Sequence, residues 1–161
     1  MILIGYDGSP DAQAAIELAG ELFPGKPATV LSVWEPFVDV MARTGLGLAF
    51  TAGANIDEID KASEQAARER ADEGVERASA AGLKAQPRIG AREATIAEAI
   101  LEVAEELKAR VIVLGTRGLT GLKSVVLGSV SHAVLVHTDR AVLVVPPPGV
   151  ASARAEHLHL Q

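Results

Sequence analysis

The chain contains no cysteine among its 161 residues. Disulfide bonds, thiolate metal sites and cysteine nucleophiles are therefore excluded. Aromatic residues make up only 3% of the sequence, so a hydrophobic core must consist mainly of valine, isoleucine, leucine and alanine. Such a core suits a parallel sheet covered by helices, because strands that are buried on both faces are built from aliphatic runs.

Long apolar runs and an excess of positive charge are also missing. The run from Met1 to Ile4 ends before Asp7, which is too short for a signal peptide or a membrane span, and we expect a cytoplasmic protein by default. The net charge of −6 and the pI near 5.2 argue against binding of duplex nucleic acid, which needs a basic face. The negative net charge is compatible with binding of a nucleotide, because one phosphate site needs only a few local N–H groups.

What the sequence does contain is a regular alternation of apolar runs and amphipathic segments. Its length and its 48% of hydrophobic residues match one globular domain. The apolar runs predict five buried strands, at residues 1–6, 28–33, 83–89, 111–114 and 141–145. Helical spacing predicts four helices, at residues 10–22, 57–81, 95–107 and 129–137. Residues 37–55 show no clear period and are interpreted as a long loop.

This order of elements predicts an α/β protein with a doubly wound parallel sheet, because alternating strands and helices are joined by right-handed crossovers. We assign residues 1–146 to this domain and residues 147–161 to a flexible C-terminal tail. Ligands of such sheets bind beyond the carboxyl ends of the strands, where the strand order reverses. Two loops are therefore candidates for a site: residues 7–10 and residues 115–128.

The loop after the fourth strand has a pattern that suits an anion. Gly115 and Gly118 allow a tight turn and a close approach of a ligand to the backbone. Gly128 and Ser129 begin the next helix, whose first N–H groups have no partner within it. With the helix dipole and the hydroxyl groups of Ser129 and Ser131, these donors would form an anion site. A glycine-rich turn before a serine-capped helix, with no ligand, explains the same residues.

Two charged residues near these loops have two interpretations each. Arg117 would bind a phosphate through a charge-assisted contact, or would stay solvated at the surface. Asp7 would contact a ligand, or would cap the following turn with its side chain. Ser9 is interpreted as a helix cap. His132 and His137 are interpreted as structural, because neither has a partner at a spacing typical of metal or catalytic sites.

The motif Gly115-x2-Gly118-x9-Gly128-Ser129 resembles the nucleotide-binding signature of the universal stress protein family, with every spacing intact. The opening Ile4–Ser9 and the final strand through Val142–Pro146 are also typical of that family, so the resemblance covers residues 1–146. It implies a five-stranded sheet of order 3-2-1-4-5 with helices on both faces, as in adenine nucleotide α-hydrolase-like folds. Because all the signature glycines are present, the chain resembles the ATP-binding branch of the family.

The resemblance also implies where an ATP molecule would bind. Adenine would lie near Val33 and the first loop, with Asp7 close to the ribose or adenine, and a magnesium ion would be held mainly through the phosphates. The implied contact residues are Gly5, Tyr6, Asp7, Val33, Leu114, Gly115, Arg117, Gly118, Gly128, Ser129, Val130 and Ser131. The edge strand 141–145 would pair with a second copy of the chain to form a homodimer.

Three functions fit these observations. The first is an ATP-binding regulatory or stress-response switch with little or no hydrolysis, because only Asp7 is a candidate general base. Its output would be its dimer or an unidentified protein partner. The second is an enzyme, either a slow ATPase or an adenylating enzyme, although the Ser-Gly-Gly-x-Asp-Ser loop of adenylating relatives is missing after the first strand. The third is a dimeric interaction module that needs no nucleotide.

Overall fold

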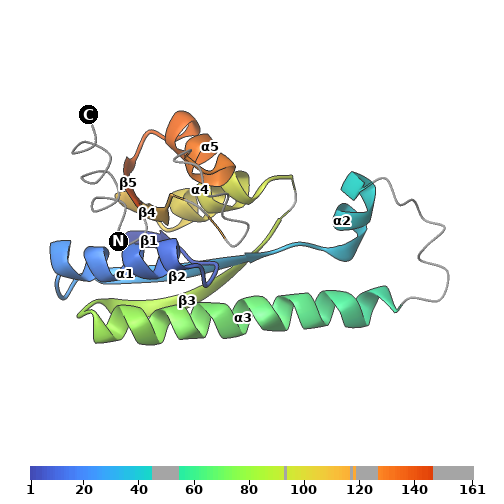
Figure 1. Ribbon diagram of the computed structural model, residues 1–161, viewed down its shortest axis with the longest axis horizontal. Helices are drawn as coiled ribbons and strands as arrows, with labels where there is room; N and C mark the ends of the chain where they lie inside the picture. The colour runs from blue at the N-terminus through green and yellow to red at the C-terminus, as the bar shows by residue number, and fades with distance from the viewer. Residues whose placement is uncertain (45–54, 93, 117, 119–126, 147–161) are drawn as a thin grey trace, which may run out of the picture.

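The computed structural model of the chain describes residues 1–44, 55–92, 94–116, 118 and 127–146, so the predicted tail lies outside it. The described strands form one five-stranded parallel sheet of order β3-β2-β1-β4-β5 (Figure 1). The predicted fold class and strand order are confirmed. The strands are β1 (Ile2–Gly5), β2 (Pro27–Trp34), β3 (Lys84–Ala91), β4 (Val111–Gly115) and β5 (Ala141–Val145), and the helices are α1 (Pro10–Leu22), α2 (Phe37–Thr44), α3 (Ile56–Ala80), α4 (Ile96–Glu106) and α5 (Ser129–His137).

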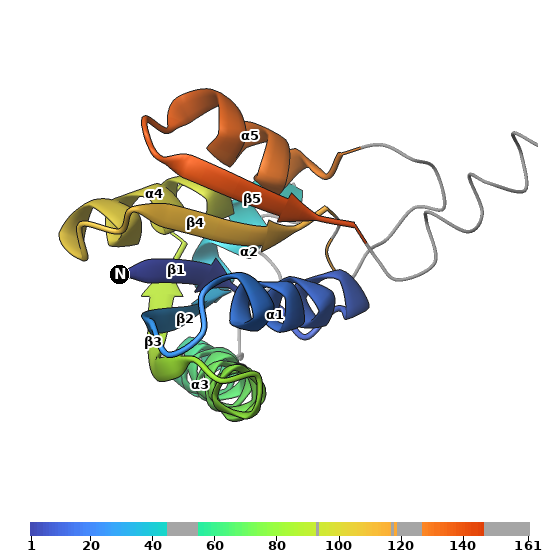
Figure 2. The same cartoon turned by 90° about the vertical axis from the view of Figure 1, so that its left-hand side faces the viewer.

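Helices cover both faces of the sheet, as the sequence predicts. Helices α1 and α3 lie on one face, and α4 and α5 lie on the other (Figure 2). Neighbouring residues of one strand point to opposite faces, so Ile4 and Val30 pack with α1 and α3, whereas Leu3 and Leu31 pack with α4 and α5. Among the described helices, none has the length and the apolar stretch that are needed to cross a bilayer.

Helix α3 lies very close to the sheet because its buried face carries only small residues, which are Ala67, Ala71, Gly74 and Ala78. A Cβ atom at Gly74 would come within 2.7 Å of Val30 Cγ1. The helix has 25 residues and extends past the end of the sheet, so that its N-terminal half and α2 stand beside the carboxyl end of β2 (Figure 1).

Local backbone features define the start of α1 and the end of α3. The N–H group of Ala12 donates to Ser9 Oγ at 3.2 Å, which confirms Ser9 as the cap of α1. Helix α3 ends at Ala80, and the chain turns away from it at Gly82, whose φ of +89° favours glycine. There the N–H group of Leu83 donates to the carbonyl oxygen of Ala78 at 2.9 Å.

The prediction of a loop over residues 37–55 is wrong in its first part, because Phe37–Thr44 form helix α2. Eight residues are too few for a helical period to stand out in the sequence. The stabilising contact also comes from far along the chain, since the N–H group of Phe37 donates to Asp60 Oδ1 of α3 at 2.7 Å. Residues 45–54 lie outside the described part of the chain.

The contact between α1 and the end of α3 yields a stability prediction at Gly20. A Cβ atom there would lie 2.3 Å from the carbonyl oxygen of Ala81. In a solvent-exposed helix, alanine is more stabilising than glycine by about 1 kcal/mol. Here, however, the Cβ atom would overlap with backbone that cannot rotate away. We therefore expect Gly20→Ala to lower the free energy of unfolding, measured by urea denaturation, by about 1–3 kcal/mol.

The matched control is Glu17→Ala on the exposed face of the same helix, which should change stability by less than about 0.5 kcal/mol. A Gly20→Ala protein as stable as the wild type would show that the two helices can move apart freely.

Candidate functional site

A cavity of about 870 Å³ lies beyond the carboxyl ends of β1, β2 and β4. The strand order reverses at this place, because β2 and β3 follow β1 on one side of it, whereas β4 and β5 lie on the other side. The cavity is lined by all the predicted contact residues except Arg117, which lies outside the described residues: Gly5, Tyr6, Asp7, Val33, Leu114, Gly115, Gly118, Gly128, Ser129, Val130 and Ser131.

Other residues line the cavity that the motifs did not indicate. They come mainly from α2, α3, α4 and the ends of β2 and β4, which reach the site through tertiary packing. They are Ala12, Leu31, Trp34, Glu35, Val40, Ser63, Arg70, Ile96, Ile100, Thr116 and Leu127. Helix α4 therefore adds apolar side chains to the lining, whereas α3 adds a guanidinium group and a serine hydroxyl, and β2 adds an indole ring.

The first turn of α5 forms one end of the cavity. Gly128 is its N-cap, and the N–H group of Gly128 donates to the carbonyl oxygen of Thr116 at 2.7 Å. The N–H groups of the first turn have no partner within the helix, and this turn carries no acidic residue. These donors and the positive end of the helix dipole favour a negatively charged group at this place.

The hydroxyl group of Ser131 has a different role from the predicted one. It is almost fully buried, and it lies 3.1 Å from the carbonyl oxygen of Thr116 and 3.0 Å from that of Gly128. A hydroxyl has only one hydrogen to donate. That hydrogen is used within the loop, so Ser131 stabilises the loop with its side chain and offers only its N–H group to an anion.

The glycines at 115 and 118 leave space for other parts of the protein. A Cβ atom at Gly115 would lie 2.7 Å from Asp11 Cβ and 2.9 Å from the backbone nitrogen of Ala12. At Gly118 it would lie 2.7 Å from Asp7 Oδ2. Gly115 is therefore required by the close approach of α1 to β4, whereas a side chain at Gly118 would displace the carboxylate of Asp7.

Asp7 caps its own turn and also faces the cavity. Its Oδ1 accepts a hydrogen bond from the N–H group of Ser9 at 3.0 Å, which confirms the capped turn. Its carboxylate also lines the cavity, with Oδ2 beside Gly118. The turn itself passes through Gly8, whose φ is +84°.

Thr116 joins the strand to the helix on the other side. Its Oγ1 donates to Asp11 Oδ2 at 2.7 Å. Asp11 is 5% exposed and lies in the first turn of α1, where the helix dipole favours a carboxylate. Elsewhere at the cavity rim, Arg92 forms an ion pair with Glu35. Within the described residues, no three histidine, aspartate or glutamate side chains gather closely enough to hold a metal ion.

Tyr6 directs its hydroxyl group to α3. The phenol donates to Glu73 Oε1 at 2.9 Å, and Arg77 contacts the same oxygen at 3.0 Å. Burial raises the pKa of Tyr6, and Glu73 raises it further. The side chain of Tyr6 therefore holds α3 on the sheet.

The same cluster makes the stability of the protein depend on pH. The hydrogen bond from Arg77, and then that from Tyr6, lowers the pKa of Glu73 below its ordinary value of 4.5. A lowered pKa means that folding favours the ionised form, so this contribution is complete above 4.5 and is lost as the pH falls through the folded-state pKa. We expect the stability lost in Glu73→Gln, measured by urea unfolding, to shrink in acid.

The control is Glu69→Gln, which alters a neighbouring carboxyl that bonds only to Gln65 among the described residues. A difference between wild type and Glu73→Gln that stays constant from neutral to acidic pH would contradict the role given to the Glu73 carboxylate.

The structure is a doubly wound sheet with a helix N-terminus at its switch point, the place where such sheets bind their ligands. The sequence model of the universal stress protein family matches residues 1–146. A curated relative, the universal stress protein in QAH/OAS sulfhydrylase 3'region of Thermus aquaticus, is 36% identical over 146 residues, or 89% of this chain and 96% of the relative. The chain belongs to the universal stress protein family.

Solved structures share this fold. The protein MJ0577 matches with a TM-score of 0.71 and 22% identity, over 90% of this chain and 94% of its own. The universal stress protein of Archaeoglobus fulgidus in complex with dAMP has a TM-score of 0.60 and 21% identity, over 89% and 95%. A family member from Arabidopsis thaliana with AMP bound has a TM-score of 0.61 and 14% identity, over 91% and 90%.

Proposed function

We propose that this universal stress protein binds an adenine nucleotide in the cavity and acts as a nucleotide-dependent regulatory switch. The observation that carries the proposal is the first turn of α5, which opens into the cavity at the end opposite β2. Phosphates bind its N–H groups, and the nucleoside extends across β1 toward Val33 at the end of β2. The relatives solved with dAMP and AMP support an adenine base.

We propose ATP as the physiological ligand, with a magnesium ion held through the phosphate oxygens, since magnesium prefers oxygen ligands and keeps part of its water shell. Hydrolysis would be slow or absent. Of the carboxylates that line the cavity, Asp7 accepts a hydrogen bond from Ser9 N–H and Glu35 is paired with Arg92. Both are held by the protein, whereas a general base must reach an attacking water.

Binding is tested by Gly128→Asp. Aspartate is a favourable N-cap, so the fold should be kept, while its carboxylate would repel the phosphates from the first turn of α5. We expect Mg-ATP affinity, measured by titration calorimetry, to fall by at least about tenfold, and turnover of the wild type to stay below roughly 1 per second.

Arg68→Met serves as the control, because it changes the net charge by the same amount on an exposed face of α3. If Gly128→Asp and the wild type bound Mg-ATP with equal affinity, the phosphates would not bind at the first turn of α5. Wild-type turnover in the ordinary enzyme range would instead favour the ATPase alternative.

The output of the switch, we propose, is a homodimer formed through the outer edge of β5. This strand pairs only with β4 in the sheet, and an apolar unpaired edge tends to bind another strand. Helix α5 lies over β5 (Figure 2), and its Leu135 and Val136 are exposed. A two-fold axis would place these residues against their counterparts in the second copy.

Sedimentation tests this proposal. We expect a dimer at micromolar concentration, and we expect Val136→Glu to shift it toward monomer. The fold should tolerate this substitution, because the side chain of Val136 is already 60% exposed. Leu22→Glu, at an equally exposed position on α1, should leave the dimer intact. A wild-type monomer, or equal dissociation of both variants, would contradict the proposed interface.

A further inference from the structure

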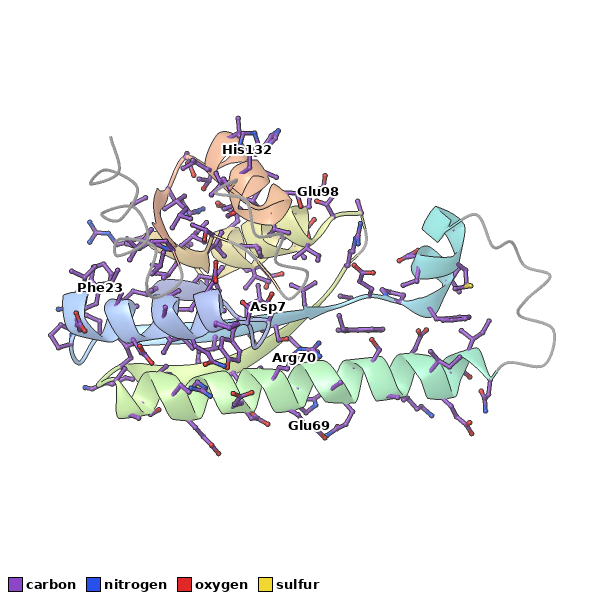
Figure 3. The ribbon with its side chains drawn as sticks, in the orientation of Figure 1. Asp7, Phe23, Glu69, Arg70, Glu98 and His132 are labelled. Carbon is purple, nitrogen blue, oxygen red and sulfur yellow. The ribbon has the colours of Figure 1, made fainter. Side chains whose placement is uncertain are left out.

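Arg70 lines the cavity on the face of the sheet opposite α5. It projects from α3, where its Nε donates to Ser32 Oγ on β2 at 3.2 Å, and that hydroxyl is only 1% exposed. Figure 3 shows the Arg70 side chain directed toward the sheet and Asp7, whereas the neighbouring Glu69 points away into solvent. One nitrogen of the guanidinium group is therefore fixed to the sheet, beside the cavity.

No carboxylate within the described part of the chain pairs with this arginine. Other arginines of α3 pair with a glutamate one turn away, as Arg68 does with Glu64 and Arg77 with Glu73. The residues four positions before and after Arg70 are Ala66 and Gly74, which offer no such partner. Glu73, three positions on, is already bonded to Arg77 and Tyr6.

The order of the strands determines which part of a nucleotide would meet Arg70. Strand β1 lies between β2, which holds Ser32, and β4, which leads to the anion site. Two strand spacings separate β2 from β4, or about 10 Å. A nucleotide with its phosphates on the first turn of α5 therefore directs its base, not its phosphates, toward Arg70.

The surroundings of Arg70 suit a planar ring. Trp34 and Val40 also line the cavity and add apolar surface. A guanidinium group is planar and weakly hydrated and stacks on aromatic rings, and every nucleobase offers such a face. We propose that Arg70 packs its guanidinium group against the base of the bound nucleotide and so determines affinity for the nucleoside. This inference rests on the proposed function.

The test compares adenosine, AMP and Mg-ATP, which share the base and differ in their phosphates. Binding is followed by the fluorescence of Trp34, the single tryptophan of the chain, which lines the cavity. Arg70→Met keeps an unbranched side chain and removes the planar cation. We expect about a tenfold loss for all three compounds, with their relative affinities unchanged.

Two further variants make the result specific. Arg70→Lys keeps the charge without the planar group, and most of the loss should remain. Arg68→Met removes an exposed arginine of the same helix and should bind as the wild type does. Urea midpoints of all variants show whether the fold is kept.

Several outcomes would overturn the inference. Unchanged binding by Arg70→Met, full recovery in Arg70→Lys, or a loss that grows from adenosine to ATP would each exclude contact with the base, and the last would make Arg70 a phosphate ligand. A wild type that binds none of the three compounds contradicts the proposed function as well. Normal wild-type binding with an unaffected Arg70→Met contradicts the role of Arg70 alone.

Discussion

The candidate site depends on the hydrogen bonds that converge on Thr116. Its hydroxyl donates to the buried carboxylate of Asp11, which ties the end of β4 to α1. Its carbonyl oxygen accepts from the N–H group of Gly128 and lies within hydrogen-bond distance of the Ser131 hydroxyl, which ties the same residue to α5. The missing Cβ of Gly115 allows this close approach. One residue thus fixes the starts of two helices at the switch point of the sheet.

This arrangement explains how an acidic chain can offer an anion site. The donors are backbone N–H groups at the start of α5, held in place by Thr116 and Gly128, so a phosphate there does not require a basic surface. The net charge of −6 still disfavours long polyanions. A small anionic ligand with an apolar base fits both facts, because apolar side chains such as Val33 and Ile100 also line the cavity.

The sequence was sufficient for the fold and for the glycine framework of the site. Aliphatic runs alternating with amphipathic segments define the parallel sheet, and Gly115, Gly118 and Gly128 were found by their spacing because backbone geometry leaves a local signature. The spacing alone did not reveal that Gly115 and Gly118 make room for protein atoms. It gave no sign that the Ser131 hydroxyl is already bonded within the loop.

Side chains brought in by tertiary packing could not be found in this way. Arg70 lies 38 positions from Ser32, its partner on β2, so no local pattern in the sequence points to its place in the site. Helix α2 is similarly fixed from a distance by Asp60. Local periodicity indicates which face of an element is buried. These contacts depend instead on where the 25 residues of α3 lie along the sheet and beyond its end.

The central claim is that the cavity at the switch point binds an adenine nucleotide. Titration calorimetry of the purified protein with Mg-ATP tests this binding most directly. It is done at two temperatures, so that an enthalpy of zero at one of them does not hide binding. We expect saturable binding of one nucleotide per chain. The absence of saturable heat at both temperatures would contradict it, and the glycine-rich loop would then be a structural turn in a dimeric interaction module.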